Sequence, residues 1–145
     1  MQAHHDDDAI AELGQEFVRF WRQGRAEMRR SAREVHPRLE PPGYQLMNLL
    51  HAADAVPTSE LLCEMGAEKS TLSRQLAALE RLGLAERTPD PNDSRARLVA
   101  LTAQGRTLID RQRERNAERW RAKFATWDES DIRTLTALLR RSLGD

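Results

Sequence analysis

The chain has 145 residues, of which 32% are charged, and its 23 Lys and Arg residues balance 23 Asp and Glu residues. This length suits one domain, with or without helical arms. No stretch of 18 apolar residues exists, and the first ten residues lack the basic and apolar regions of a signal peptide, so we expect neither a membrane span nor a leader. A single cysteine, Cys63, excludes an intramolecular disulfide and a cysteine-rich zinc site, and the cytoplasm is the expected compartment.

A long helix is the first predicted element, because apolar residues recur at spacings of three and four from residue 8 to residue 35. The dipeptide His36-Pro37 should end it, since the residue before a proline avoids the α region. Before this helix, His4, His5 and three aspartates resemble a set of metal ligands. Acidic residues are also typical of a helix start, and structural metal sites draw their ligands from ordered elements. We therefore predict no metal site.

Two short helices joined by a tight turn form the centre of the chain. Before them we expect a loop at residues 38–42, a helix at residues 43–53 and a short strand at Val56. Thr58 and Ser59 are expected to cap the first of the two short helices. Gly66 should end it, because glycine tolerates the positive φ of a helix C-terminus. The second helix should run from Lys69 to Leu82, with a buried stripe of leucines. This arrangement predicts a helix-turn-helix.

Polar residues gather at the start of the second helix, mostly off the leucine stripe. In a helix-turn-helix this part of the second helix enters the DNA major groove. Arg and Lys can donate to guanine, Gln can pair with adenine, and Ser or Thr suit either base. The predicted DNA-reading residues are Lys69, Ser70, Thr71, Ser73, Arg74 and Gln75.

A β-hairpin should follow the helix-turn-helix, with strands at residues 84–88 and 97–101. The Pro-, Asp- and Asn-rich residues 89–94 between them predict a long exposed tip. Arg95 and Arg97 flank this tip and could reach a minor groove, where the potential is most negative if the groove is narrow. We expect Asp93 to hold Arg95 by a bidentate ion pair. The fold class is therefore mainly α with a small β-hairpin wing.

Two further helices complete the chain. Thr102 should cap a long, mostly charged helix at residues 103–126, and an acidic stretch at residues 128–131 should start the last helix. The first and last helices are half apolar, so a two-fold partner is expected to cover them. The predicted parts are an N-terminal dimerisation helix at 1–40, a winged helix-turn-helix at 41–104, and C-terminal dimerisation helices at 105–145.

The run DPNDSRARLVALTAQGRTLI closely resembles the wing and following helix of the MarR family, the multiple antibiotic resistance regulators. Upstream, LERLGLAER matches the end of that family's recognition helix and its second strand. The resemblance implies a dimeric winged-helix transcription regulator, often a repressor, often relieved by a small molecule or an oxidant. Asn92 and Ser94 stand where the family often has basic residues, which implies a weaker grip of the wing on DNA. The motif residues here are Asp90, Asp93, Arg95, Leu101, Thr102 and Gly105.

Charge is not concentrated in the predicted DNA-binding part. Residues 41–104 hold six Lys and Arg against eight Asp and Glu, a net charge of −2, whereas residues 105–145 carry +3. Nonspecific affinity should be modest and salt-sensitive, so sequence recognition must contribute more. The local basic residues are Lys69, Arg74, Arg81, Arg87, Arg95 and Arg97.

The resemblance also implies an effector pocket between the dimerisation helices and the DNA-binding part. Arginine and histidine would suit a phenolic, aromatic or urate-like anion, although residues such as Trp21 and Met47 more often belong to a hydrophobic core. The candidate residues are Trp21, Arg25, His36, Tyr44, Met47 and His51.

Three other functions fit the sequence less well. The chain has no nucleophile elbow, no glycine-rich phosphate loop and no readable nucleophile–base pair, so we expect no enzyme and no cofactor. A winged helix can instead bind a protein partner, in which case substitution of the DNA-reading arginines would not alter DNA binding. Cys63 could act as a redox sensor, although a small, partly buried hydrophobic role is the simpler interpretation.

Overall fold

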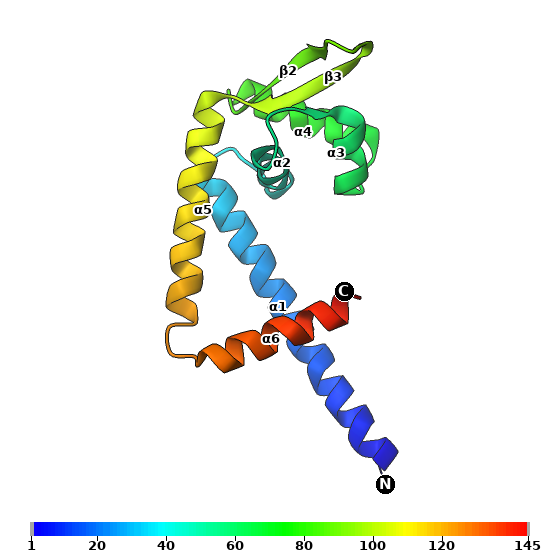
Figure 1. Cartoon of the computed structure of the whole chain (residues 1–145), viewed down its shortest axis with the longest axis vertical. Helices are drawn as coiled ribbons and strands as arrows, with labels where there is room; N and C mark the ends of the chain where they lie inside the picture. Colours follow the sequence, from blue (N-terminus) through cyan, green and yellow to red (C-terminus); the bar gives the residue numbers. More distant parts are fainter. Residues whose placement is uncertain (1, 145) are drawn as a thin grey trace. The chain divides into compact units, whose positions relative to one another are not determined.

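The computed structural model describes the backbone of residues 2–144 and the side chains of residues 6–144. Figure 1 shows a mainly helical chain with one small antiparallel sheet. No helix of this described part is both long and apolar enough to cross a membrane. The side chains of His4 and His5 lie outside it, and the described residues form no cluster of metal-ligating side chains. The elements are α1 (Gln2–Val35), α2 (Pro41–His51), β1 (Val56–Pro57), α3 (Thr58–Met65), α4 (Lys69–Arg81), β2 (Ala85–Asp90), β3 (Asp93–Leu101), α5 (Ala103–Lys123) and α6 (Glu129–Leu143).

The chain divides into two compact units, residues 1–112 and residues 113–145, with the boundary inside α5. The first unit holds α1, the helix-turn-helix of α3 and α4, the sheet and the start of α5. The second unit holds the rest of α5 together with α6. The predicted helix-turn-helix followed by a hairpin is therefore confirmed within the first unit.

The hydrophobic core of the first unit lies between the end of α1, helices α2 to α4, the inner face of the sheet and the first turns of α5. Leu72, Leu76 and Leu79 of the predicted leucine stripe are buried, because their spacing of three and four places them on one face of α4. Met47 and Leu50 of α2 contribute fully buried side chains to the same cluster. This packing fixes α4 against the rest of the first unit.

The sheet has the strand order β1-β3-β2, and both pairings are antiparallel. The short strand predicted at Val56 is confirmed, since Val56 pairs with Val99. The predicted long turn at residues 89–94 is wrong, because Pro89 pairs with Arg97 and Asp90 pairs with Asp93 after a register shift. A proline is compatible with β2 because this strand lies at the edge of the sheet. The wing is therefore a longer ladder with a short tip.

A compact turn connects α4 to β2. The N–H of Leu84 donates to the Leu79 carbonyl oxygen over 2.9 Å, and the N–H of Gly83 donates to the Glu80 carbonyl oxygen over 3.0 Å. These two bonds form a Schellman motif, which needs a left-handed residue at Gly83, where φ is +69°. Leu79 and Leu84 are both fully buried. The direction in which the wing leaves α4 is thus set by hydrogen bonds and by packing.

Several predicted helix boundaries differ from the structure. α1 begins at Gln2 instead of residue 8, although it ends before His36 as predicted. α2 begins at Pro41, not at residue 43, because the first turn of a helix does not need the N–H that proline lacks. Thr58 is already helical and Pro57 is the N-cap, with no side-chain cap bond, so the predicted Thr58–Ser59 cap is wrong.

The first turn of α5 agrees with the prediction. The Thr102 hydroxyl oxygen accepts the Gly105 N–H over 3.0 Å, which is the predicted N-cap.

In the second unit, every residue of α6 is exposed in the single chain. The apolar side chains on one face of this helix include Leu135 and Leu139, each 37% exposed, and Leu143, 79% exposed. The turn before α6 carries an aromatic cluster, in which Phe124 stacks on Trp120 and contacts the edge of Trp127. Both apolar surfaces are left without cover within their own unit.

Candidate nucleic-acid interface

Most of the predicted reading residues are presented to solvent by the first turns of α4. Lys69, Ser70, Ser73 and Arg74 are exposed and Thr71 is half-buried. They lie opposite the buried leucine stripe, so the packing of α4 on the core turns them outward. Their donors and acceptors are the types that recognise base edges.

Gln75 does not belong to this exposed set, and its burial argues against the predicted role in reading DNA. Its side chain is 8% exposed, and its Nε2 donates to the Glu40 carboxylate over 3.4 Å. The amide lies near Gly43, so Gln75 faces α2 and not solvent. The helical period was the signal that could have separated Gln75 from Arg74, because Gln75 lies beside the leucine stripe and Arg74 lies nearly opposite it.

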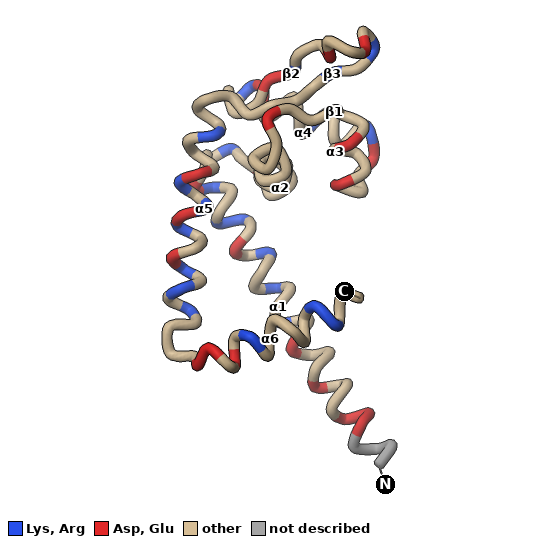
Figure 2. Tube along the Cα trace, viewed as in Figure 1, with Lys and Arg blue, Asp and Glu red and all other residues tan. Residues whose placement is uncertain are grey.

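The wing presents two exposed arginines near its tip, Arg95 and Arg97. Figure 2 shows basic residues toward the end of the hairpin. The predicted ion pair between Asp93 and Arg95 is absent from the described structure. Instead, the Asp93 carboxylate accepts the backbone N–H of Arg95 over 3.0 Å, and the Asp90 carboxylate accepts the N–H of Asn92 over 2.9 Å. Both are local turns in which the aspartate shapes the backbone, so Asp93 leaves the Arg95 guanidinium free to contact a partner.

The basic residues of the helix-turn-helix and wing are not equivalent. Arg87 of β2 forms an ion pair with Glu80 of α4. In the described part of the chain, no ion pair involves Lys69, Arg74, Arg95 or Arg97. These four cations can therefore contact phosphate or base edges without first breaking an ion pair.

The candidate effector residues have different environments. Tyr44 and Met47 are buried in the core, whereas Trp21 of α1 is 62% exposed and Arg25 is exposed beside it along the same helix. The Nδ1 of half-buried His36 accepts the N–H of Arg38 over 3.0 Å. The His51 Nε2 lies 2.5 Å from a carboxylate oxygen of Asp110. Met47 thus lies in the core of the first unit, whereas Trp21 is exposed in the single chain.

Two α5 residues that the sequence did not single out contact the end of α2. The Arg106 guanidinium donates to the carbonyl oxygens of His51 and Ala53, over 3.5 Å and 3.4 Å, and Asp110 contacts the His51 ring. A cation is favourable at the C-terminus of a helix because the carbonyl groups there carry partial negative charge. The spacing of four residues places Arg106 and Asp110 on one face of α5, which is the signal that could have identified them.

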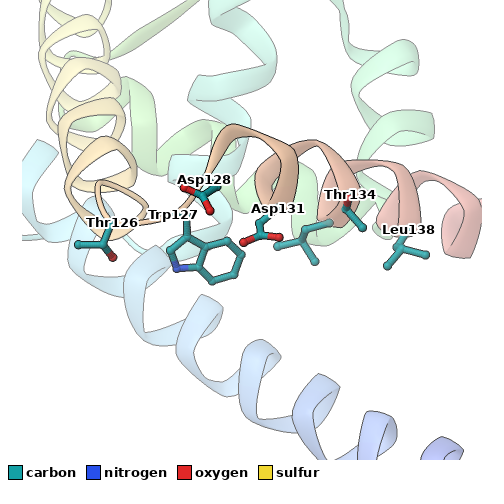
Figure 3. Close-up of a pocket in the computed structure, with 7 residues that line it drawn as sticks. Thr126, Trp127, Asp128, Asp131, Thr134 and Leu138 are labelled. Carbon is teal, nitrogen blue, oxygen red and sulfur yellow. The ribbon is translucent and has the colours of Figure 1, made fainter.

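A shallow hollow lies in the second unit, at the start of α6. Figure 3 shows its lining residues, among which Asp128 and Asp131 lie near Trp127, and Leu138 lies farther along α6. None of the candidate effector residues lines it.

Cys63 lies in α3 and its side chain is exposed, so the expectation of a partly buried thiol is wrong.

Comparison with known proteins agrees with this architecture. Residues 39–96, from the end of the loop before α2 into the wing, match the MarR family. The chain is 32% identical over 103 residues to the HTH-type transcriptional regulator YxaD of Bacillus subtilis strain 168, covering 71% of this chain and 72% of YxaD. It is 24% identical over 142 residues to the HTH-type transcriptional repressor IacR of Pseudomonas putida, covering 94% of this chain and 84% of IacR.

A solved structure of similar fold is that of a cysteine-to-serine mutant of Escherichia coli MarR complexed with operator DNA. The TM-score is 0.71 with 22% sequence identity, and the match covers 92% of this chain and 95% of that chain. The order of helix-turn-helix and wing, the matched residues 39–96 and the identity to YxaD agree with one another. The chain belongs to the MarR family, with the winged helix-turn-helix fold of that family's transcription regulators.

Proposed function

We propose that this chain is a sequence-specific DNA-binding transcription regulator that acts as a homodimer on a pseudo-palindromic operator and responds to a small effector. The observation that carries the proposal is the exposed polar start of α4 beside a wing with two exposed arginines near its tip. The similar E. coli MarR mutant was solved with operator DNA, and the similar IacR is a transcriptional repressor. Repression is therefore the proposed effect, and the cytoplasm the proposed compartment.

The proposed contacts divide into base reading and backbone positioning. The start of α4 would enter the major groove, where Lys69 or Arg74 can donate to guanine and Ser70, Thr71 and Ser73 can donate or accept. Arg95 and Arg97 would contact the adjacent minor groove or its phosphates. Such contacts raise the affinity for DNA but discriminate little between sequences. Asp93 would support the wing through its backbone bond to Arg95.

The dimer is supported by apolar surface that the single chain leaves exposed. One face of α6 consists of isoleucine and leucine side chains, and Ile10 and Leu13 on α1 are 66% and 57% exposed. Burying apolar surface yields about 25 cal/mol per Å², so a second copy that covers these helices would gain substantially. Residues 1–40 and 105–145 would then supply the interface, and residues 41–104 would bind DNA. The two recognition helices of such a dimer would read half-sites about 10 bp apart.

The effector is proposed to be a small aromatic or anionic molecule. Arg25, His36 and His51 supply polar groups that suit an anion, and His51 lies beside Arg106 and Asp110, where α2 meets α5. A ligand there would change DNA affinity only if it bound one arrangement of these helices better than another.

An exposed thiol supports a second candidate, a regulator that senses oxidants. Cys63 lies on α3 of the helix-turn-helix, so oxidation there would alter the DNA-binding part directly. If the wild type loses DNA binding in dilute peroxide and the Cys63→Ser variant does not, the sensor is redox-based. Equal responses would eliminate this candidate.

The test is selection of binding sites from a randomised duplex library, followed by gel shifts of the enriched duplex and a scrambled duplex over a salt series. We expect an enriched pseudo-palindrome, two chains per site, and preference for the enriched duplex at every salt concentration. If no sequence is enriched, or both duplexes bind equally, the regulator proposal is overturned and the protein-partner function takes its place.

A further inference from the structure

One ion pair connects the recognition helix to the wing. Glu80 lies in the last turn of α4 and Arg87 in the middle of β2, and the Nε of Arg87 contacts a carboxylate oxygen of Glu80. Each side chain is 35% exposed, so the pair lies at the edge of the core where water screens it only partly. Figure 1 shows the hairpin beside α4, and the two elements are in contact.

The positions of both residues follow from the fold. Arg87 pairs with Val99 across the ladder, and directly opposite residues of an antiparallel pair point to the same face of the sheet. Because Val99 is fully buried, Arg87 points to the inner face, toward the helices. Glu80 follows buried Leu76 by four residues, which places it beside the buried stripe of α4, and α4 is in contact with β2. The two charges are therefore brought together by the backbone of both elements.

The outer half of the wing depends for its direction on the contact between α4 and β2. β1 pairs only with Val99 and Leu98 of β3, so the hairpin beyond Leu98 has no third strand beside it. Arg95 and Arg97 lie in that outer half. The Schellman turn sets the direction in which β2 leaves α4, and the ion pair adds a contact farther along the same strand.

We propose that Glu80 and Arg87 are positioning residues that hold the wing against the recognition helix, so that Arg95 and Arg97 meet DNA while α4 occupies the major groove. Arg87 then supports the DNA contacts without making one, although the sequence groups it with the other basic residues of the winged helix-turn-helix. This inference rests on the proposed DNA-binding function.

The sign of the Glu80→Ala effect separates positioning from simple charge. Removing a carboxylate from a DNA-binding part should strengthen binding to a polyanion if charge alone matters. Positioning requires the opposite, so Glu80→Ala should weaken binding of the selected duplex, by about three- to tenfold if contacts of one wing arginine are loosened. Arg87→Ala should weaken binding to a similar degree, and the charge swap Glu80→Arg with Arg87→Glu should recover most of the affinity.

Glu86→Ala is the matched control. Glu86 precedes Arg87 on β2, carries the same charge as Glu80 and is exposed, but it pairs with Ala100 and points to the other face of the sheet. We expect unchanged or slightly tighter binding for this variant. Thermal unfolding of each variant should stay close to that of the wild type, since a half-exposed ion pair contributes little to stability.

The salt dependence identifies what Arg87 does. A residue that contacts a phosphate contributes about one to the slope of log affinity against log salt. Arg95→Ala should lower the slope by that amount, whereas Arg87→Ala should leave it unchanged. In a Glu80→Ala background the loss caused by Arg95→Ala should shrink, because the wing is no longer held in place.

The outcomes separate this inference from the proposed function. If the unsubstituted protein shows no sequence-selective DNA binding, both are overturned. If it binds selectively but Glu80→Ala binds as well or better, the positioning pair is rejected while the regulator stands. If Arg87→Ala lowers the salt slope, Arg87 is a direct DNA contact and the positioning pair is likewise rejected.

Discussion

The hydroxyl of Thr102 donates a hydrogen bond to the carbonyl oxygen of Gly83 over 2.6 Å. Thr102 is the last residue before α5, and Gly83 is the glycine of the turn between α4 and β2. The same hydroxyl accepts the Gly105 N–H as the N-cap of α5. One side chain therefore connects the end of the recognition helix to the start of α5.

Thr102→Val should destabilise the protein by about 1–2 kcal/mol, because it removes an N-cap and leaves the Gly83 carbonyl without this donor. Urea unfolding followed by circular dichroism measures the change. Thr107→Val is the control, since the Thr107 hydroxyl bonds only to a carbonyl oxygen of its own helix and is exposed. A cost within about 0.5 kcal/mol is expected there. Equal costs for both variants would show that Thr102 has no special role.

Gly105→Ala should be more severe. A Cβ at this position would lie 2.0 Å from the carbonyl oxygen of Leu84, which is backbone and cannot move aside as a side chain could. We expect the free energy of unfolding to fall by about 3 kcal/mol, at the upper end of what overpacking costs. The neighbouring exposed residue offers a control, since Gln104→Ala should change stability by less than about 0.5 kcal/mol. A Gly105→Ala protein as stable as the wild type would contradict the close packing of α5 on Leu84.

Arg74→Ala should lose discrimination among base pairs, by about 1–3 kcal/mol if the arginine makes a bidentate contact to guanine. Competition between the selected duplex and single-base variants of it gives this energy position by position. Gln75→Met is the comparison, because the buried Gln75 faces Glu40 and its substitution should leave base preference unchanged. A change of preference for Gln75→Met without one for Arg74→Ala would reverse the assignment.

Leu139→Glu should dissociate the proposed homodimer. Burying an unpaired carboxylate in an apolar interface costs several kcal/mol, so the dissociation constant should rise by about a hundredfold or more. Sedimentation equilibrium at micromolar concentration measures it. Ala137→Glu introduces the same charge on nearly the opposite side of α6, since successive helical residues are about 100° apart, and should leave the dimer intact. A wild-type monomer under these conditions would refute the dimer.

The elements that the sequence predicted correctly depend on local chemistry. The leucine spacing in residues 72–79, the glycines that end α3 and α4, and the Thr102 cap each act within a few residues, so their patterns are visible in the chain itself. The wing motif added the family resemblance, which the match of residues 39–96 bears out.

The tertiary structure decided which polar residues remain available for DNA. Gln75 is buried against Glu40, Asp93 bonds to backbone instead of a guanidinium, and Arg87 is neutralised by Glu80. The partners of Gln75 and Arg87 are Glu40 and Glu80, which lie in other parts of the fold, so the sequence does not show these contacts. The Asp93 carboxylate could bind either the backbone N–H or the guanidinium of Arg95, and the sequence is consistent with both. The chain alone determined that a helix-turn-helix and a wing form, because periodicity and turn residues act locally. Which charges stay free depends on how α2, α4 and the sheet pack, because that packing decides which side chains meet.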